Sequence, residues 1–154
     1  MDDDRIGSTV MKVTRSVLVP YHAEEMFDVV NDVTSYPSFV PGCMDATVLE
    51  STPETMRATL MMKRAGVSLT LTTDNRLNRP SSIELGLVDG PFRYLSGQWR
   101  FEPLGDDGCR VALNLDFAAS SLTALMIESM FGRMADEMVD AFIARAEHLY
   151  TDEN

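Results

Sequence analysis

Four methionines recur at four-residue steps near the end of the chain, and the chemistry they suit is apolar binding. They are Met126, Met130, Met134 and Met138, and Phe142 and Ala146 continue the step. Residues four apart lie on one side of a helix, so this spacing predicts one apolar helix face. Methionine is flexible and polarizable, which lets such a face adapt to irregular apolar shapes. The face is therefore either a stripe of the hydrophobic core or one wall of a cavity for an apolar ligand.

Catalytic groups at a telling spacing are absent from the sequence. It contains no Walker loop, no dinucleotide-binding glycine fingerprint and no nucleophile elbow. His22 and His148 have no carboxylate or cysteine at a catalytic spacing, and both favour the surface. The acidic pairs Asp106-Asp107 and Asp136-Glu137 are typical of solvated charges, and Asp89 is typical of the Asp-Gly-Pro turn that it starts. These residues predict a protein without enzymatic activity and without a metal site.

One strand-like segment places a tryptophan beside a glycine. Leu95, Gly97, Trp99 and Phe101 alternate along this segment and share one face. Gly97 leaves space beside the indole, which suits a bound ligand or a closely passing backbone. Trp99 therefore either fills the core against the final helix or forms the floor of a cavity, where its N–H can reach a polar head group.

The composition fits one domain with a full-sized core. The chain has 154 residues, is 45% hydrophobic and carries a formal charge of −11. Its densest basic pair is Lys63-Arg64, so we expect no DNA binding and no docking on an anionic membrane through a basic patch. We find no signal-peptide pattern and no apolar run of about 18 residues. We therefore expect a cytoplasmic protein with two reduced cysteines, Cys43 and Cys109, and at most peripheral contact with the inner membrane.

Hydrophobic periodicity predicts an α+β domain over residues 11–150, with a leader or non-native start at 1–10 and a frayed tail at 151–154. A β-branched run predicts a strand at 13–19, and helical spacing predicts helices at 23–33 and 34–39. Segments with a period of two predict six further strands, at 45–51, 55–63, 67–77, 82–88, 94–103 and 109–117. Because the connections are short, consecutive strands should pair as an antiparallel meander. The final helix is predicted from a serine cap at Ser120 or Ser121 to about Tyr150.

This order of elements favours a cavity. A twisted antiparallel sheet that wraps a long helix leaves space that side chains do not fill at every level. We therefore expect a cavity between sheet and helix, with the methionines in its wall. The start of the final helix is apolar almost all round, through Leu122, Leu125, Met126, Ile127, Met130 and Phe131. These additional apolar side chains either close the mouth of the cavity, contact a membrane or a partner protein, or are buried under the segment 36–41.

Several motifs resemble the RatA and coenzyme Q-binding branch of the START-domain superfamily. They are Leu18-Val19-Pro20-Tyr21, Val30-Asn31-Asp32-Val33, Ser35-Tyr36-Pro37-Ser38-Phe39, Pro41-Gly42-Cys43, Leu87-Val88-Asp89-Gly90-Pro91-Phe92 with Gly97 and Trp99, and Leu115-Asp116-Phe117. The Asp-Gly-Pro-Phe segment followed by Gly-x-Trp is the most specific of them. The resemblance spans about residues 11–150, and Pro41-Gly42-Cys43 looks closest to the bacterial members.

The resemblance implies a helix-grip fold of the START and Bet v 1 type, with a curved antiparallel sheet of about seven strands round a long C-terminal helix. It also implies a non-enzymatic protein that binds ubiquinone or a related isoprenoid lipid, held without a covalent bond, and supports respiratory electron transport. Together with the apolar pattern, it leads us to expect ligand contacts from Phe39, Phe92, Leu95, Trp99, Phe117, Met126, Met130, Phe131, Met134 and Met138.

Two alternative functions stay open. Bacterial members of this branch are called ribosome-association toxins, which implies binding to the large ribosomal subunit and a block of subunit joining. A charge of −11 fits poorly with ribosomal RNA, so contact would run through ribosomal proteins or a local patch at Lys63 and Arg64. The superfamily also includes cyclases and dehydratases. An enzyme would need polar groups in the cavity, and the candidates Tyr94, Arg100 and Asp116 lie on strand faces that we predict to point outward.

Overall fold

A computed structural model describes residues 10–121 and 125–151 of the chain. Most of the predicted leader, at 1–9, and most of the predicted tail, at 152–154, lie outside the described residues. Residues 122–124 ahead of the last helix also lie outside them, so the serine cap at Ser120 or Ser121 stays a prediction.

Seven strands form one antiparallel sheet in the order β1-β7-β6-β5-β4-β3-β2. Strands β2 to β7 follow one another as the predicted meander, and β1 closes on β7, with Met11 opposite Phe117 and Val19 opposite Cys109. The strands are β1 (Met11–Val19), β2 (Cys43–Ser51), β3 (Thr55–Arg64), β4 (Val67–Asn78), β5 (Ser82–Asp89), β6 (Phe92–Leu104) and β7 (Gly108–Ala119).

Short helices separate β1 from β2, and their boundaries differ from the prediction. Helix α1 spans Ala23–Asn31, the 3-10 helix η2 spans Val33–Ser35, and α2 spans Tyr36–Phe39. At the start of α1, Glu25 Oε1 accepts a hydrogen bond of 2.9 Å from the His22 backbone N–H. The predicted helix at 23–33 ends early because Asp32 leaves the helical conformation, with φ −85° and ψ 67°. The chain then turns through η2 before α2 begins.

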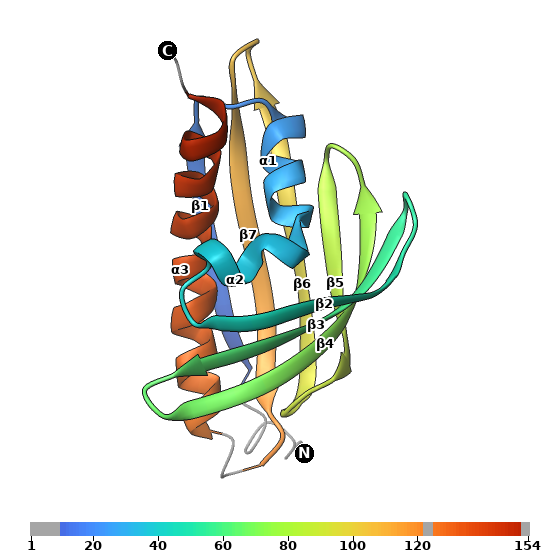
Figure 1. Cartoon of the computed structure of the whole chain (residues 1–154), viewed down its shortest axis with the longest axis vertical. Helices are drawn as coiled ribbons and strands as arrows, with labels where there is room; N and C mark the ends of the chain where they lie inside the picture. Colours follow the sequence, from blue (N-terminus) through green and yellow to red (C-terminus); the bar gives the residue numbers. More distant parts are fainter. Residues whose placement is uncertain (1–9, 122–124, 152–154) are drawn as a thin grey trace, which may run out of the picture.

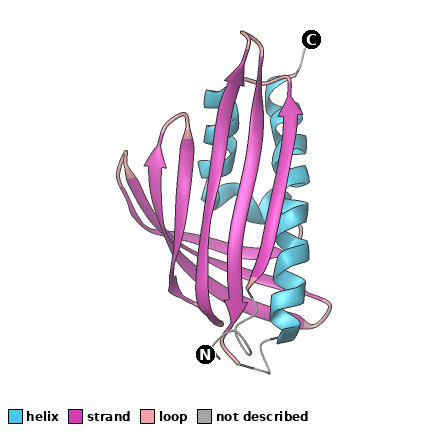
Figure 2. Ribbon diagram, turned by 180° about the vertical axis from the view of Figure 1, so that it is seen from behind, coloured by secondary structure: helices cyan, strands magenta, loops and turns pink. Residues whose placement is uncertain are grey.

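The sheet curls round a single long helix, α3 (Leu125–Tyr150), as predicted. Strands β1, β6 and β7 run along α3, whereas β2, β3 and β4 cross it and complete the grip (Figure 1). Seen from behind, the sheet forms a continuous outer wall with the helices on its concave side (Figure 2). No helix among the described residues is long and apolar enough to cross a membrane.

The inner face of the sheet is apolar because side chains alternate along each strand. Between Val111 and Phe117 of β7 the buried side chains are Val111, Leu113, Leu115 and Phe117, and the positions between them are exposed or half-buried. This alternation confirms the predicted buried and wet faces of the last strand. The predicted outward positions also hold, since Tyr94 and Arg100 are exposed and Asp116 bonds to Lys12 at 3.2 Å.

Candidate functional site

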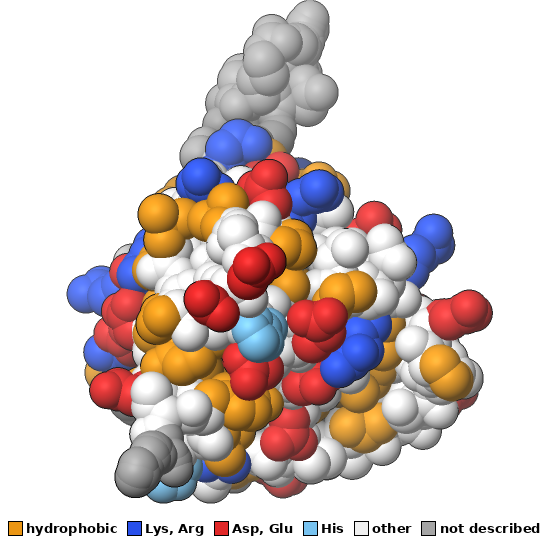
Figure 3. Space-filling view, turned by 90° about the horizontal axis from the view of Figure 1, so that it is seen from above, with side chains coloured by type: hydrophobic (Ala, Val, Ile, Leu, Met, Phe, Trp, Pro, Cys, Tyr) orange, Lys and Arg blue, Asp and Glu red, His pale blue; other side chains and the backbone are white. Residues whose placement is uncertain are grey.

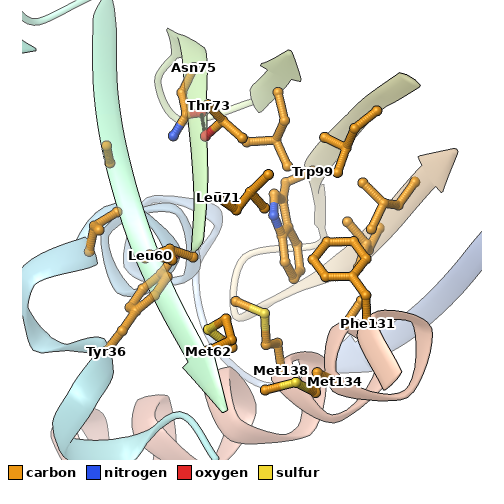
Figure 4. Close-up of a pocket in the computed structure, with 17 residues that line it drawn as sticks. Tyr36, Leu60, Met62, Leu71, Thr73, Asn75, Trp99, Phe131, Met134 and Met138 are labelled. Atoms are coloured by element: carbon orange, nitrogen blue, oxygen red, sulfur yellow. Dashed lines mark hydrogen bonds between the residues drawn. The ribbon is translucent and has the colours of Figure 1, made fainter. Parts of the chain in front are cut away.

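A cavity of about 90 Å³ lies between the concave face of the sheet and the middle of α3. Figure 4 shows side chains converging on it from both layers. Its walls come from β3, β4, β5, β6, β7, α3 and the two short elements after α1. The lining residues are Val33, Tyr36, Ala58, Leu60, Met62, Leu71, Thr73, Asn75, Leu85, Leu95, Trp99, Leu113, Leu115, Phe131, Met134, Ala135 and Met138.

The helix wall follows ordinary helical spacing rather than the four-residue methionine step. Phe131, Met134, Ala135 and Met138 line the cavity, which is the i, i+3, i+4, i+7 pattern of one helix face. A helix turns by about 100° per residue, so each four-residue step drifts by about 40°. Three steps carry Met126 about 120° away from Met138. The prediction that all four methionines share one wall is therefore wrong.

Five of the ten predicted contact residues line the cavity: Leu95, Trp99, Phe131, Met134 and Met138. Whether they contact a ligand stays a prediction. Trp99 satisfies both interpretations of its position, because it lines the cavity and also stacks on Phe101, with ring centres 6.4 Å apart. The space beside Gly97 is taken by Leu115, since a Cβ there would lie 2.6 Å from Leu115 Cδ1.

Three of the other five predicted residues are aromatic rings that close the ends of the core. The Phe92 ring packs 5.9 Å from Phe117 and 5.0 Å from Phe131, so these rings fill the space beside the cavity. Phe39 packs against Tyr36 at 6.0 Å, and the guanidinium of Arg145 lies 5.0 Å above its ring. Phe39, Phe92 and Phe117 are therefore outside the cavity lining, and whether they contact a ligand stays a prediction.

The remaining two are methionines on other sides of α3. Met130 is buried in the core without lining the cavity, and Met126 is 69% exposed. The segment 36–41 packs on Phe142 instead, with Tyr36 and Phe142 ring centres 5.2 Å apart. Met126 is therefore not buried under that segment. The side chains of Leu122 and Leu125 lie outside the described part of the chain.

A polar pair inside the cavity was not predicted from the sequence. Thr73 and Asn75 lie on the inner face of β4 between Leu71 and Leu77, and the Thr73 hydroxyl donates a hydrogen bond of 2.8 Å to Asn75 Oδ1. The signal was available in the sequence. Following the alternation of Leu69 and Leu71 along the strand places both polar residues on the apolar face.

The cavity otherwise offers little for acid–base chemistry. No charged side chain and no cysteine lines it among the residues that the structure describes. The phenol of Tyr36 donates a hydrogen bond to the Val30 carbonyl oxygen, and burial raises the pKa of Tyr36 far above its usual value. Cys43 and Cys109 are free, buried thiols away from the lining. The arrangement suits a neutral, mainly apolar molecule.

Occupancy of this cavity requires its methionines to move. A cavity of about 150 Å³ holds benzene, so the present space is too small for a prenyl chain. Met62, Met134 and Met138 lie together at one end (Figure 4), and methionine side chains change shape at little cost. Gly42, with φ +84°, packs against Met134, where a Cβ would lie 2.3 Å from Met134 Cε. The Pro41-Gly42-Cys43 motif thus makes room for one of these methionines.

Comparisons with known proteins agree with this architecture. The family described as polyketide cyclase / dehydrase and lipid transport matches residues 19–143. Two solved structures share the fold at 22% identity: the Zhui aromatase/cyclase from Streptomyces sp. R1128, with a TM-score of 0.79 over 90% of this chain and 94% of that one, and a START superfamily protein from Mycobacterium smegmatis, with a TM-score of 0.76 over 90% and 98%. The predicted helix-grip fold is confirmed.

Proteins with similar sequences identify the branch of the superfamily to which the chain belongs. The persistence and stress-resistance toxin PasT of Escherichia coli O6:H1 is 47% identical, over 91% of this chain and 89% of its own. The ribosome association toxin RatA of Escherichia coli K12 is 46% identical over the same shares. The mitochondrial coenzyme Q-binding protein COQ10 of Drosophila melanogaster is 30% identical, over 84% of this chain and 56% of its own. The chain therefore belongs to the polyketide cyclase, dehydrase and lipid transport family, within the RatA and coenzyme Q-binding branch of the START superfamily.

Proposed function

We propose that this protein binds a neutral isoprenoid lipid of the quinone class between its sheet and α3, without catalysing a reaction on it. The observation that carries the proposal is the cavity wall, which combines apolar side chains with one polar pair and no charged side chain among its described residues. Burial of apolar ligand surface would supply the affinity, at about 25 cal/mol per Å² before ordering costs. In this proposal the protein serves the quinone pool of the respiratory chain.

The name of the Drosophila relative supports the quinone class, although that protein is a distant relative. The size of the cavity sets a condition on the proposal, because the methionine end must open to admit a prenyl chain. Four lining residues are half-buried, so the lining approaches solvent at each of them: Leu60, Thr73, Leu85 and Met138. Among them, Met138 on α3 belongs to the methionine end, where Met62 comes from β3 (Figure 4). We therefore place the entrance between β3 and α3.

The test is uptake of ubiquinone by the purified protein, together with mass spectrometry of lipids extracted from freshly purified material. Ala135 lines the cavity and is buried, so Ala135→Leu fills the space that the ligand needs. Ala144 lies exposed on the same helix, and Ala144→Leu is the matched control. We expect Ala135→Leu to weaken uptake at least tenfold and Ala144→Leu to leave it unchanged. Absence of any bound lipid and of any uptake by the unchanged protein would overturn the proposal.

We propose association with the large ribosomal subunit as a second function. The observation that favours it is the name of the relatives with 46% and 47% identity, both called toxins and one of them a ribosome association toxin. Acidic side chains gather on the end of the molecule where α1 begins (Figure 3), and α1 carries Glu24 and Glu25 in its first turn. That end repels RNA, so we place the ribosomal contact on other surfaces or on ribosomal proteins.

Co-sedimentation with large subunits at physiological salt tests this second function. The Ala135→Leu variant makes the test sharper, because it blocks the cavity without altering the surface. Binding of both the unchanged protein and the variant would support a ribosomal role that does not depend on the ligand. Failure of the unchanged protein to co-sediment would overturn the proposal of ribosome association.

A further inference from the structure

We propose that Asn75 and Thr73 form a head-group site that selects ligands with carbonyl oxygens, so that the cavity binds a quinone in preference to its hydroquinone. This inference rests on the proposed function and adds the chemistry and redox state of the ligand to it. The two side chains lie at one end of the cavity, and the three methionines lie at the other (Figure 4).

The first step is burial. Asn75 is only 9% exposed, although it is an uncharged polar residue on an apolar strand face. A buried amide costs free energy unless its donors and acceptors are bonded. The Asn75 amide oxygen is bonded to Thr73, and the amide NH₂ is not among the fully buried atoms that lack a partner in the described residues. The NH₂ group therefore keeps room for a bonding partner, which a ligand would supply.

The second step is orientation. The Thr73 hydroxyl donates to Asn75 Oδ1 at 2.8 Å, so the amide oxygen is bonded and the amide NH₂ is left to donate to another partner. Within the described ranges, that NH₂ group has no hydrogen-bond partner, and neither has the indole N–H of Trp99. Both residues line the cavity. The lining thus offers unbonded N–H donors on Asn75 and Trp99, whereas its side-chain oxygens, on Thr73, Asn75 and Tyr36, already take part in hydrogen bonds within the protein.

The third step is the chemistry that these donors recognise. A carboxylate or a phosphate needs a cation, and an amine needs an acid, but the described lining contains neither. Carbonyl oxygens accept from N–H donors without any proton of their own, which matches a quinone. A hydroquinone brings two O–H donors into a site already rich in donors. One unsatisfied buried donor is enough to weaken binding by about tenfold.

The test compares a short-chain ubiquinone with its hydroquinone, under anaerobic conditions, by quenching of tryptophan fluorescence. Trp99 is the single tryptophan of the chain and lies in the cavity wall, so its emission reports occupancy there. We expect the unchanged protein to bind the quinone at least tenfold more tightly than the hydroquinone. A prenyl hydrocarbon of equal length serves as the ligand without a head group.

Asn75→Leu keeps the approximate side-chain size and removes the donors, so we expect it to reduce the preference for quinone to about twofold or less. Binding of the prenyl hydrocarbon should not change. Thr73→Val, which removes the hydroxyl that orients the amide, should have a smaller effect in the same direction. Asn114→Leu is the matched control, because Asn114 is exposed on the outer face of β7.

The outcomes separate this inference from the proposed function. If quinone and hydroquinone bind equally, or if Asn75→Leu retains the preference while the prenyl hydrocarbon still binds, the head-group site is wrong and the lipid-binding function stands. If no prenyl ligand binds the unchanged protein, both are overturned. Thr73→Val guards against a folding defect in Asn75→Leu, since valine has nearly the shape of threonine. Circular dichroism of each variant completes the comparison.

Discussion

Two stretches of the inner face of α3 meet the same sheet in opposite ways. Towards its carboxyl end, Val139, Phe142 and Ala146 are fully buried, and the Phe142 ring lies 5.3 Å from Trp99 and 5.2 Å from Tyr36. Towards the middle, Met134, Ala135 and Met138 face the cavity. One helix therefore carries a tightly packed region and a loosely packed region side by side.

The difference teaches that helix coverage and side-chain shape together decide where space remains. Helix α1 lies beside the carboxyl-terminal half of α3 and fills the grip there (Figure 1). Next to the cavity, Ala135 on α3 and Ala58 on β3 are small, and the methionines around them are flexible rather than interlocking. Aromatic rings that pack edge to face leave no such freedom.

Removal of the Phe142 ring should have the largest effect on stability. Phe142→Ala deletes a ring that is 1% exposed and contacts Tyr36, Phe39 and Trp99, so we expect a loss of about 3–5 kcal/mol in the free energy of unfolding. Met138→Ala in the loosely packed region should cost clearly less, because Met138 is half-buried and already borders empty space. Urea denaturation measures both. Equal losses in the two variants would contradict the division into two regions.

A pH titration tests the burial of Cys109, which lies beside β1 and near the start of α1, away from the cavity lining, without removing a large side chain. Cys109 is 0% exposed, and burial, with a smaller effect of Glu25 and Glu24, raises its pKa from 9.0 to about 11. The unfolded thiol therefore loses its proton at lower pH than the folded one. The stability that a neutral Cys109 maintains is complete below pH 9 and is lost as the pH rises towards 11, with a slope of at most about 1.4 kcal/mol per pH unit.

The measurement is urea denaturation of the protein and of Cys109→Ala at several pH values between 8 and about 11. We expect the stability of the unchanged protein to fall more steeply than that of the variant over this range. Parallel curves would show that the buried thiol titrates as freely in the folded protein as in the unfolded chain.

The smallest effect on stability should come from the ion pair beside the cavity entrance. Arg64 on β3 bonds to Glu137 on α3, the neighbour of Met138. The two side chains are 40% and 34% exposed, so solvent screens the pair, and Arg64→Met should change the free energy of unfolding by no more than about 1 kcal/mol. Because the pair ties β3 to α3, the same variant should take up ubiquinone faster.

Arg57→Met is the matched control for that experiment. Arg57 pairs with Asp74 at 2.6 Å and 3.0 Å, but this pair joins the neighbouring strands β3 and β4 and does not reach α3. Stopped-flow measurement of Trp99 quenching gives the uptake rates. Equal uptake rates in the two arginine variants would contradict an entrance between β3 and α3.

Much of the fold could be predicted because its signals are local. Each strand of the meander has its own two-residue alternation and its own breaker, and α3 has a helical stripe. The pairing of β1 with β7 had no local signal, since the paired residues Val19 and Cys109 lie 90 positions apart in the sequence. The early end of α1 also depended on one residue, Asp32, whose backbone leaves the helix.

The site could be predicted only in part, and its errors have a physical reason. A four-residue repeat looks like one face in sequence but rotates round a real helix, so Met126 and Met130 were assigned wrongly. Phe92 and Phe117 do face inward, but they contact Phe131 rather than open space. Thr73 and Asn75 were not predicted because the strand at 67–77 was predicted without assigning its residues to an inner and an outer face.

The sequence by itself determined the order of elements, the inward face of each strand and the apolar character of the interior, since each depends on residues close together in the chain. Only the tertiary structure decided which inward side chains meet empty space. A cavity is what remains between several elements after they pack, so its place depends on the curvature of the sheet where β2, β3 and β4 cross α3. It also depends on where α1 stops filling the grip.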